Sequence, residues 1–222
     1  MLLREVAYAK PSSVAEALEI LAADDGARAL AGGQTLINVM KARARPILGD
    51  VCAQIADVQV RNRGTIGGNV CTNDPTNHLP PLLAALGAEF TIAGADGERT
   101  VSSDEFFLGV YFTAVDPGEL LTSIRVPAGR NDGFAAVTLG VDGTCIASAA
   151  ASLNGSVRIA LGCVDAVPVV LSPASSEDDA VRAAVREAEL DPPSDVHASS
   201  EYRTHLAEVL AVRAVAQAKG AA

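Results

Sequence analysis

Two glycine pairs constrain this chain more than any other feature of its sequence. The first lies in Ala31-Gly32-Gly33-Gln34-Thr35 and the second in Thr65-Ile66-Gly67-Gly68-Asn69. Each pair follows an apolar run and precedes a helix-like segment, so each can present bare backbone N–H groups at the start of a helix, where an anion is stabilised. A glycine pair taken alone is most often only a turn. Two such loops together could hold one diphosphate.

The composition restricts the partners that such a site can have. The chain has 222 residues, of which 49% are hydrophobic, enough for one large domain or two small ones with a sizeable core. Its formal charge of -10, with the basic residues scattered, argues against a nucleic-acid surface or an anionic membrane as partner. The first residues contain no apolar core of signal-peptide length, and no later run approaches a membrane span. We therefore expect a cytoplasmic protein.

The residues that could bind a metal are too dispersed to predict a metal site. They are Cys52, Cys71, Cys145, Cys163, His78, His197 and His205. Without a Cys-x-x-Cys pair, neither a zinc site nor an all-cysteine iron–sulfur cluster is indicated, and the cysteines are expected as small buried residues. The histidines are expected at the surface or in hydrogen bonds. We also find no nucleophile or acid–base constellation, so no catalytic residue is predicted.

The N-terminal half is expected to alternate short strands with helices. Ser13 and Glu16 form a capping box before a helix over 14–23. Asp74-Pro75 is expected to open a helix that carries an apolar stripe from Leu79 to Leu86. The other elements expected in this half are strands over 6–9, 27–31, 88–93, 99–102 and 119–127, a helix over 48–56, and a helical turn at 103–107.

The C-terminal half reads as a separate unit. A Gly-, Arg- and Asn-rich stretch over 128–133 is the expected boundary. Strands over 134–141, 145–153 and 157–163 are joined by Asp142-Gly143 and Asn154-Gly155, which favours an antiparallel meander. Helices are expected over 176–189 and 200–219, the second packing across the meander.

These segments together resemble a known family, the flavoprotein (medium) subunits of the bacterial molybdenum hydroxylases, which include xanthine dehydrogenases and carbon monoxide dehydrogenases. The resemblance covers nearly the whole chain. It is carried by AGGQTLIN at 31–38, QIADVQVRNRGTIGGN at 54–69, NDPTNHLPPLLAALGA at 73–88, ELLTSIRVP at 119–127, RIALG at 158–162 and SDVHASSEYRTHLAEVLAVRA at 194–214.

The resemblance implies an α+β fold with a two-lobed FAD-binding (PCMH-type) region and a small α/β C-terminal domain with an antiparallel meander and helices. The FAD-binding region would span 1–128, with lobe one over about 1–45 and a shortened lobe two over about 46–128, and the C-terminal domain would span 129–222. The residues implied to bind FAD are Ala31, Gly32, Gly33, Gln34, Thr35, Thr65, Ile66, Gly67, Gly68, Asn69, Asn73 and Asp74. Asp74 has a competing interpretation, as the cap of a helix that begins at Pro75.

The implied activity is electron relay by an oxidoreductase subunit. A large partner subunit would carry the molybdenum cofactor and a small one two-iron two-sulfur clusters, in a heterotrimer that itself pairs into a dimer. Two other classes remain open: a stand-alone flavin reductase of the same fold, such as the enzyme that makes UDP-N-acetylmuramate, and a flavin-free assembly subunit.

Two departures from the family pattern stand out. Relatives carry roughly forty to fifty more residues between the helix after the first glycine pair and the helix before the second, enough for several strands. Either a segment is missing at the short junction over 44–48, or the second lobe has lost part of its sheet. Many relatives also have an acidic residue at the position of His78 and a lysine near Val137, so flavin tuning through these positions is not implied here.

Overall fold

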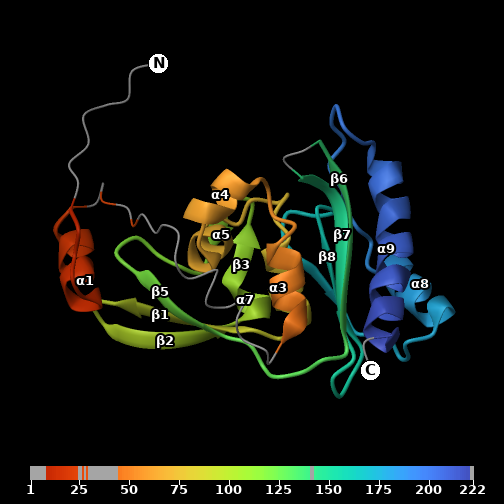
Figure 1. Ribbon diagram of the computed structural model, residues 1–222, viewed down its shortest axis with the longest axis horizontal. Helices are drawn as coiled ribbons and strands as arrows, with labels where there is room; N and C mark the ends of the chain where they lie inside the picture. Colours follow the sequence, from red (N-terminus) through yellow and green to blue (C-terminus); the bar gives the residue numbers. More distant parts are fainter. Residues whose placement is uncertain (1–8, 25–26, 28, 30–44, 141–142, 221–222) are drawn as a thin grey trace.

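The computed structural model describes residues 9–24, 27, 29, 45–140 and 143–220. In chain order its elements are α1 (Val14–Ala23), α3 (Pro46–Cys52), α4 (Val58–Arg63), α5 (Ile66–Thr72), α6 (Leu79–Ala85), β1 (Glu89–Gly94), β2 (Gly97–Ser102), α7 (Ser103–Phe106), β3 (Phe107–Gly109), β4 (Phe112–Thr113), β5 (Leu120–Arg125), β6 (Asp132–Leu139), β7 (Thr144–Ser152), β8 (Arg158–Gly162), β9 (Val169–Leu171), α8 (Asp178–Glu187) and α9 (Ser200–Gly220). They form the expected α+β fold (Figure 1). The expected strand over 6–9, most of that over 27–31, and the first glycine pair lie outside the described residues.

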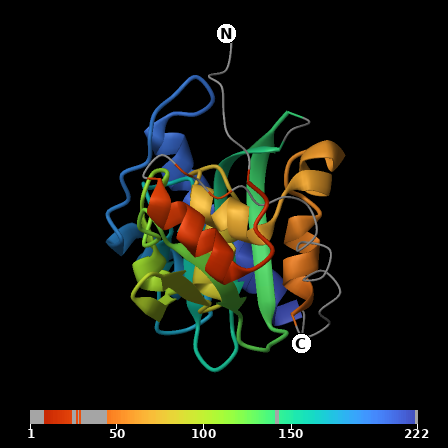
Figure 2. The same cartoon turned by 90° about the vertical axis from the view of Figure 1, so that its left-hand side faces the viewer.

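Helix α1 confirms the prediction made from its capping residues. Ser13 Oγ accepts a hydrogen bond from the Glu16 N–H at 3.2 Å. The Glu16 carboxylate returns to Ser12, whose N–H and hydroxyl both donate to it at 2.7 Å, so the reciprocal bond is one residue earlier than in a standard capping box. The helix lies at one end of the molecule, beside the β1–β2 hairpin (Figures 1 and 2).

The prediction of a single helix over 48–56 is wrong. Helix α3 already begins at Pro46 and ends at Cys52. A proline in the first turn of a helix loses no hydrogen bond. Ala56 then takes a left-handed conformation, with φ 44°, and turns the chain. Asp57 caps a second helix, α4, by accepting a hydrogen bond from the Val60 N–H at 2.8 Å. Apolar spacing predicted the helical content but not this break.

Helix α6 also begins later than expected, at Leu79 rather than Pro75. Pro80 and Pro81 occupy its first turn, where their missing N–H groups need no partner. Its apolar stripe is core, as predicted, and every residue of the helix is buried. His78, expected at the surface or in hydrogen bonds, is buried against Phe134, with ring centroids 5.3 Å apart. Its Nδ1 has no hydrogen-bond partner among the described residues, and its side chain forms a hydrogen bond with Cys145.

Strands β1 and β2 form the predicted hairpin, and β5 pairs with the other edge of β1, giving an antiparallel sheet of order β2-β1-β5. A second, very short hairpin follows helix α7, in which β3 pairs with β4. The sequence did not predict it, because strands of three and two residues are too short for an alternating pattern. Its residues Leu108, Val110, Tyr111 and Phe112 are exposed.

The C-terminal half forms the predicted antiparallel meander, extended by one further strand into a sheet of order β6-β7-β8-β9. Helices α8 and α9 cover one face of this sheet (Figure 1). Helix α6 packs on the other face. Strand β7 is almost wholly buried between the two layers. Gly133 in β6 permits close approach to α9, because a Cβ there would lie 2.0 Å from the Ala214 carbonyl oxygen.

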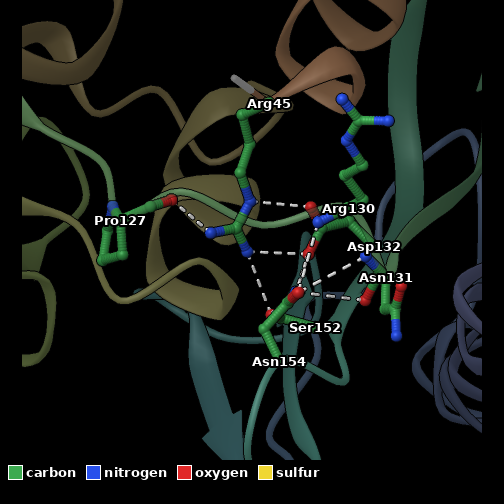
Figure 3. Close-up of polar contacts among 7 residues, drawn as sticks. All are labelled: Arg45, Pro127, Arg130, Asn131, Asp132, Ser152 and Asn154. Atoms are coloured by element: carbon green, nitrogen blue, oxygen red, sulfur yellow. Dashed lines mark hydrogen bonds and ion pairs between the residues drawn. The ribbon is translucent and has the colours of Figure 1, made fainter. Parts of the chain in front are cut away.

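A buried ion pair ties the start of α3 to the C-terminal sheet (Figure 3). Arg45 donates through Nε and Nη2 to the two carboxylate oxygens of Asp132, both at 2.7 Å. Its Nη1 donates to the Pro127 carbonyl, and its Nη2 also donates to Ser152 Oγ at 3.1 Å. Asn154 Nδ2 donates to Asp132 Oδ1 at 2.9 Å. The network joins residues on both sides of the expected domain boundary.

Candidate functional site

A cavity with a volume of about 560 Å³ lies beside α4 and α5. Its size falls within the range of about 300–1,000 Å³ that is usual for small-molecule sites. It is lined by Ala29, Ile55, Val60, Arg61, Gly64, Thr65, Gly68, Asn69, Cys71, Thr72, Asp74, Asn77 and Leu79. The structure therefore brings four of the residues predicted from the sequence, Thr65, Gly68, Asn69 and Asp74, to one concave surface.

Thr65 caps helix α5 at the cavity wall. Its Oγ1 accepts a hydrogen bond from the Gly68 N–H at 2.9 Å, and its hydroxyl proton remains available to a ligand. Gly68 fits this cap closely, because a Cβ there would lie 2.9 Å from Thr65 Oγ1. Ile66 is buried in the core, and neither Ile66 nor Gly67 lines the cavity.

Several polar atoms of this segment have no partner among the residues that the structure describes. The N–H groups of Ile66 and Gly67, in the first turn of α5, donate to no acceptor in the described residues. Asn69 Oδ1 is buried and accepts no hydrogen bond from the described residues. Asn69 lines the cavity, and an unused buried acceptor in that position indicates a polar ligand.

Asp74 is the one carboxylate among the described residues that line the cavity, and its orientation is fixed. Its Oδ1 accepts from the Thr76 N–H at 2.8 Å and from the Thr76 hydroxyl at 2.7 Å. The Tyr111 hydroxyl donates to its Oδ2 at 2.9 Å. Burial raises the pKa of Asp74, but these three hydrogen bonds outweigh burial, so its pKa lies below the ordinary value. Asp74 stays ionised, and it caps a turn rather than a helix starting at Pro75.

Asn73 does not line the cavity, although it was predicted as a site residue. It ends α5 in a left-handed conformation, with φ 44°, and is buried. Its Nδ2 donates to the carbonyls of Gly109, at 2.7 Å, and Phe112, at 3.2 Å, while its own carbonyl accepts from the Tyr111 N–H at 3.1 Å. Asn73 therefore holds the β3–β4 hairpin next to the cavity.

The sequence did not predict that Arg61 and Cys71 would line the cavity. Cys71 was expected as a small buried residue, but it is only partly buried. Arg61 Nη1 donates to the carbonyl oxygens of Ile55, at 2.7 Å, and Ala56. Burial raises the pKa of Cys71 to about 11. The position of Arg61, four residues before Thr65, could have indicated a place near the site. The direction of its side chain, however, depends on the break between α3 and α4.

A second polar cluster lies outside the cavity, between α6 and the C-terminal sheet. Its members are His78, Cys145, Ser148 and Cys163, all buried. A hydrogen bond with Cys163 lowers the pKa of Cys145, and one with His78 adds to the effect, while burial opposes both. Cys163 Sγ also lies 3.0 Å from the Pro75 carbonyl oxygen, which is an alternative acceptor for its one thiol proton. The cluster links the turn before α6 to strand β7 of the C-terminal sheet and to the residue after β8.

Two further features bear on function. Within the described ranges, no three His, Cys, Asp or Glu side chains are grouped closely enough to hold a metal ion. The longest described helix, α9, has 21 residues, and neither it nor any other helix in the described part of the chain is long and apolar enough to cross a membrane.

Comparison with known proteins gives a consistent family. Residues 42–129 match the family described as the FAD binding domain in molybdopterin dehydrogenase. The carbon monoxide dehydrogenase medium chain of Afipia carboxidovorans is 32% identical over 281 aligned residues, covering 97% of each chain. The glyceraldehyde dehydrogenase medium chain of Sulfolobus acidocaldarius is 29% identical, covering 95% of this chain and 97% of that one.

The alignment with the Afipia carboxidovorans chain is longer than this chain of 222 residues, so that relative carries several tens of additional residues within the aligned span.

Among solved structures, quinoline 2-oxidoreductase from Pseudomonas putida 86 superposes with a TM-score of 0.82 at 27% identity, over 95% of this chain and 96% of that chain. A carbon monoxide dehydrogenase superposes with a TM-score of 0.76 at 34% identity, over 85% and 74%. The chain belongs to the FAD-binding medium subunits of the molybdenum hydroxylases, a family of oxidoreductases.

Proposed function

We propose that this chain binds FAD in the cavity beside α4 and α5 and serves as the electron-relay subunit of a molybdenum hydroxylase. The observation that carries the proposal is the Thr65–Asn69 segment, which borders the cavity with hydrogen-bonding groups that no described residue uses. When bound, the flavin would accept electrons from two-iron two-sulfur clusters of a partner subunit and pass them to a terminal acceptor.

The residues present fit the diphosphate of FAD. The Thr65 hydroxyl is a donor at the cavity wall, and Gly68 keeps the backbone bare beside it. The N–H groups of Ile66 and Gly67 belong to the same first turn of α5, although these two residues do not line the cavity. Ala29 also lines the cavity, and Gly32 follows it by three residues in the sequence. An extended chain covers that interval in about 10 Å. This short interval supports a role for the loop over 31–35 in binding the same diphosphate. The loop consists of Ala31, Gly32, Gly33, Gln34 and Thr35.

The acceptors of the cavity fit the hydroxyl groups of the cofactor. A carboxylate oxygen has two acceptor positions. Both are taken on Asp74 Oδ1, by Thr76, and one is taken on Oδ2, by Tyr111. One position on Oδ2 therefore remains for a ribose or ribityl hydroxyl, and Asn69 Oδ1 offers another acceptor. We assign Asn73 a supporting role, in which it holds the hairpin that carries Tyr111.

We further propose a heterotrimer with a molybdenum-cofactor large subunit and an iron–sulfur small subunit, paired into a dimer of heterotrimers in the cytoplasm. The relatives are medium chains or medium subunits, as their names state. The β3–β4 hairpin beside the cavity exposes Leu108, Val110, Tyr111 and Phe112, and exposed apolar patches are typical of partner-binding surfaces. The four cysteines are unpaired, as in proteins of a reducing compartment.

The visible absorption spectrum of the purified protein tests the proposal most directly. Flavin bands that co-purify with the chain, and that acid precipitation releases into the supernatant, are the expected result. Release by acid is expected because the proposed contacts are all noncovalent. A folded chain that neither carries nor takes up FAD would contradict the proposal and would favour a flavin-free assembly subunit.

Substitution of Gly68 by valine should abolish flavin retention, because the added side chain would displace Thr65 Oγ1 from its cap. The matched control is Gly109→Ala, where a Cβ would make only an ordinary contact, 3.8 Å from Phe112 Cβ. Thermal melting of both apoproteins separates loss of the site from loss of the fold. Full flavin occupancy in folded Gly68→Val would show that this loop does not bind the cofactor.

The relay role predicts that the isolated chain does not turn over the substrate. Substrate-dependent dye reduction should require the partner subunits, and the three chains should co-purify. If the isolated chain were fully active, the relay role would be wrong and a stand-alone flavin reductase would be favoured.

A further inference from the structure

Arg61 is held at the cavity by one end of its guanidinium group. Its Nη1 donates to the Ile55 carbonyl at 2.7 Å and also to the Ala56 carbonyl, both in the turn between α3 and α4. Its Nε and Nη2 donate to no acceptor among the described residues. One nitrogen therefore fixes the plane of the group, while the other two nitrogens keep free N–H donors.

Charge distinguishes Arg61 from the other cavity residues. Within the described lining it is the one positively charged side chain, and Asp74 is the one negatively charged side chain. The protein as a whole has a formal charge of -10, which repels an anion from most directions. An anionic ligand of this cavity would therefore obtain most of its local charge compensation from Arg61.

The geometry of a guanidinium group indicates which kind of anion Arg61 would bind. Its N–H groups form a planar fork that matches two oxygens of a phosphate, and such charge-assisted bonds are roughly twice as strong as neutral ones. Because Nη1 is already bound, little side-chain freedom remains to be lost when a ligand binds. Thr65, four residues along the chain, lines the same cavity and adds its hydroxyl.

We propose that Arg61 binds the diphosphate of FAD through Nε and Nη2, an inference that rests on the proposed function. The dianion is then neutralised by a specific side chain and not by backbone dipoles alone. A structural role, in which Arg61 only closes the turn between α3 and α4, is the competing explanation. The two roles differ in their dependence on the phosphates of the ligand.

The test compares flavins with and without phosphate on the full chain after acid removal of flavin and refolding. Dissociation constants for FAD and for riboflavin are measured by quenching of flavin fluorescence for the wild type, Arg61→Gln, Arg61→Lys and Arg63→Gln. Arg63 is the matched control, because it is an exposed arginine of the same helix that does not line the cavity. Melting of each apoprotein checks the fold.

Arg61→Gln should weaken FAD binding by about 10- to 100-fold, the range expected for loss of a charge-assisted hydrogen bond. Riboflavin binding should be unchanged. Arg61→Lys should lie between Arg61→Gln and the wild type, since an ammonium keeps the charge but not the fork. Added salt should weaken FAD binding to the wild type more than to Arg61→Gln, and Arg63→Gln should match the wild type.

Two results would overturn the inference while leaving the proposed function intact. One is FAD binding to Arg61→Gln at the wild-type affinity. The other is an equal loss of FAD and riboflavin, which would assign Arg61 to the turn alone. A wild-type chain that binds neither flavin would overturn the proposed function itself, and this inference with it.

Discussion

The Tyr111 hydroxyl donates a hydrogen bond to Asp74 Oδ2 over 2.9 Å, so a carboxylate of the cavity wall is held from the tip of the β3–β4 hairpin. Tyr111 has a left-handed backbone with φ 57°, and Asn73, which accepts its N–H, has φ 44°. Left-handed residues other than glycine are uncommon and cost free energy, so the surrounding contacts must hold them in place.

This pair makes a prediction for the titration of Tyr111. The hydrogen bond to Asp74 and then the negative charge of that carboxylate raise the pKa of Tyr111 above its ordinary value of 10.0. Asp74→Asn removes the charge, so the pKa of Tyr111 should fall back toward that value. The measurement is the phenolate absorbance during an alkaline titration, with Tyr111→Phe used to isolate the signal from the other tyrosines.

The same pair sets a pH window for the hairpin contact. The pKa of Asp74 is lowered on folding and that of Tyr111 is raised. The contact is therefore complete between the unfolded values, near 3.8 and 10.0, and is lost as the pH falls through the folded pKa of Asp74 or rises through that of Tyr111. An unchanged Tyr111 titration in Asp74→Asn would contradict the assignment.

The buried pair of Arg45 and Asp132 should contribute far more to stability than an exposed pair. Asp132→Asn leaves the Arg45 charge buried without its counter-ion, which typically costs about 3–5 kcal/mol. The matched control is Arg125→Met, which breaks the pair with Glu89, where the side chains are 76% and 41% exposed. That loss should be about 0–1 kcal/mol. Urea unfolding followed by circular dichroism measures both, and equal losses would refute the ranking.

Gly133→Ala should destabilise the C-terminal sheet. The added Cβ would overlap the Ala214 carbonyl oxygen, at 2.0 Å, so β6 and α9 would have to separate. Overpacking of this kind usually costs about 1–3 kcal/mol. Gly109→Ala, whose nearest contact would be 3.8 Å, is the control and should melt as the wild type does. A Gly133→Ala protein with unchanged melting temperature would show that the helix shifts freely.

Alkylation of Cys71 should report occupancy of the cavity. Cys71 lines it, whereas Cys52, Cys145 and Cys163 are at most 5% exposed. Because burial raises the pKa of Cys71 to about 11, its reaction with a maleimide should be slow near neutral pH and accelerate as the pH rises. Saturating FAD should protect it, as measured by peptide mass mapping.

The control for this labelling is Cys71→Ser, in which the FAD-sensitive label should disappear. Labelling of Cys71 at the same rate with and without saturating FAD would contradict the position proposed for the cofactor. Faster labelling at neutral pH than of an ordinary thiol would contradict the raised pKa.

Local signals predicted most of the fold. Ser13 and Glu16 located α1, and Asn154-Gly155 located the turn between β7 and β8, because caps and tight turns depend on residues close in sequence. Where neighbouring prolines or caps competed, the prediction was wrong: Pro75 resembled a helix start, but Pro80 and Pro81 occupy that position. The domain boundary at residue 128 and the first glycine pair stay predictions.

The candidate site was predictable only in part. Thr65 and Asp74, which line the cavity, were predicted because glycine loops and acidic residues have a direct chemical meaning in sequence. The contributions of Tyr111 and Arg61 depend on contacts across the fold, since Tyr111 meets Asp74 from another hairpin and Arg61 meets two carbonyls at a helix break. Neither contact leaves a periodic pattern in the chain.

Strand β7 limits how this molecule can change over evolution. Ala150 faces α6, and Ala149 and Ala151 face α9, so methyl groups occupy both sides of one layer. A larger residue on either face would push the helix on that face away from the strand, because both faces are close-packed and leave no free volume. Substitutions here should be restricted by volume rather than by polarity, and the separation between the two halves of the protein should drift less than their surfaces do.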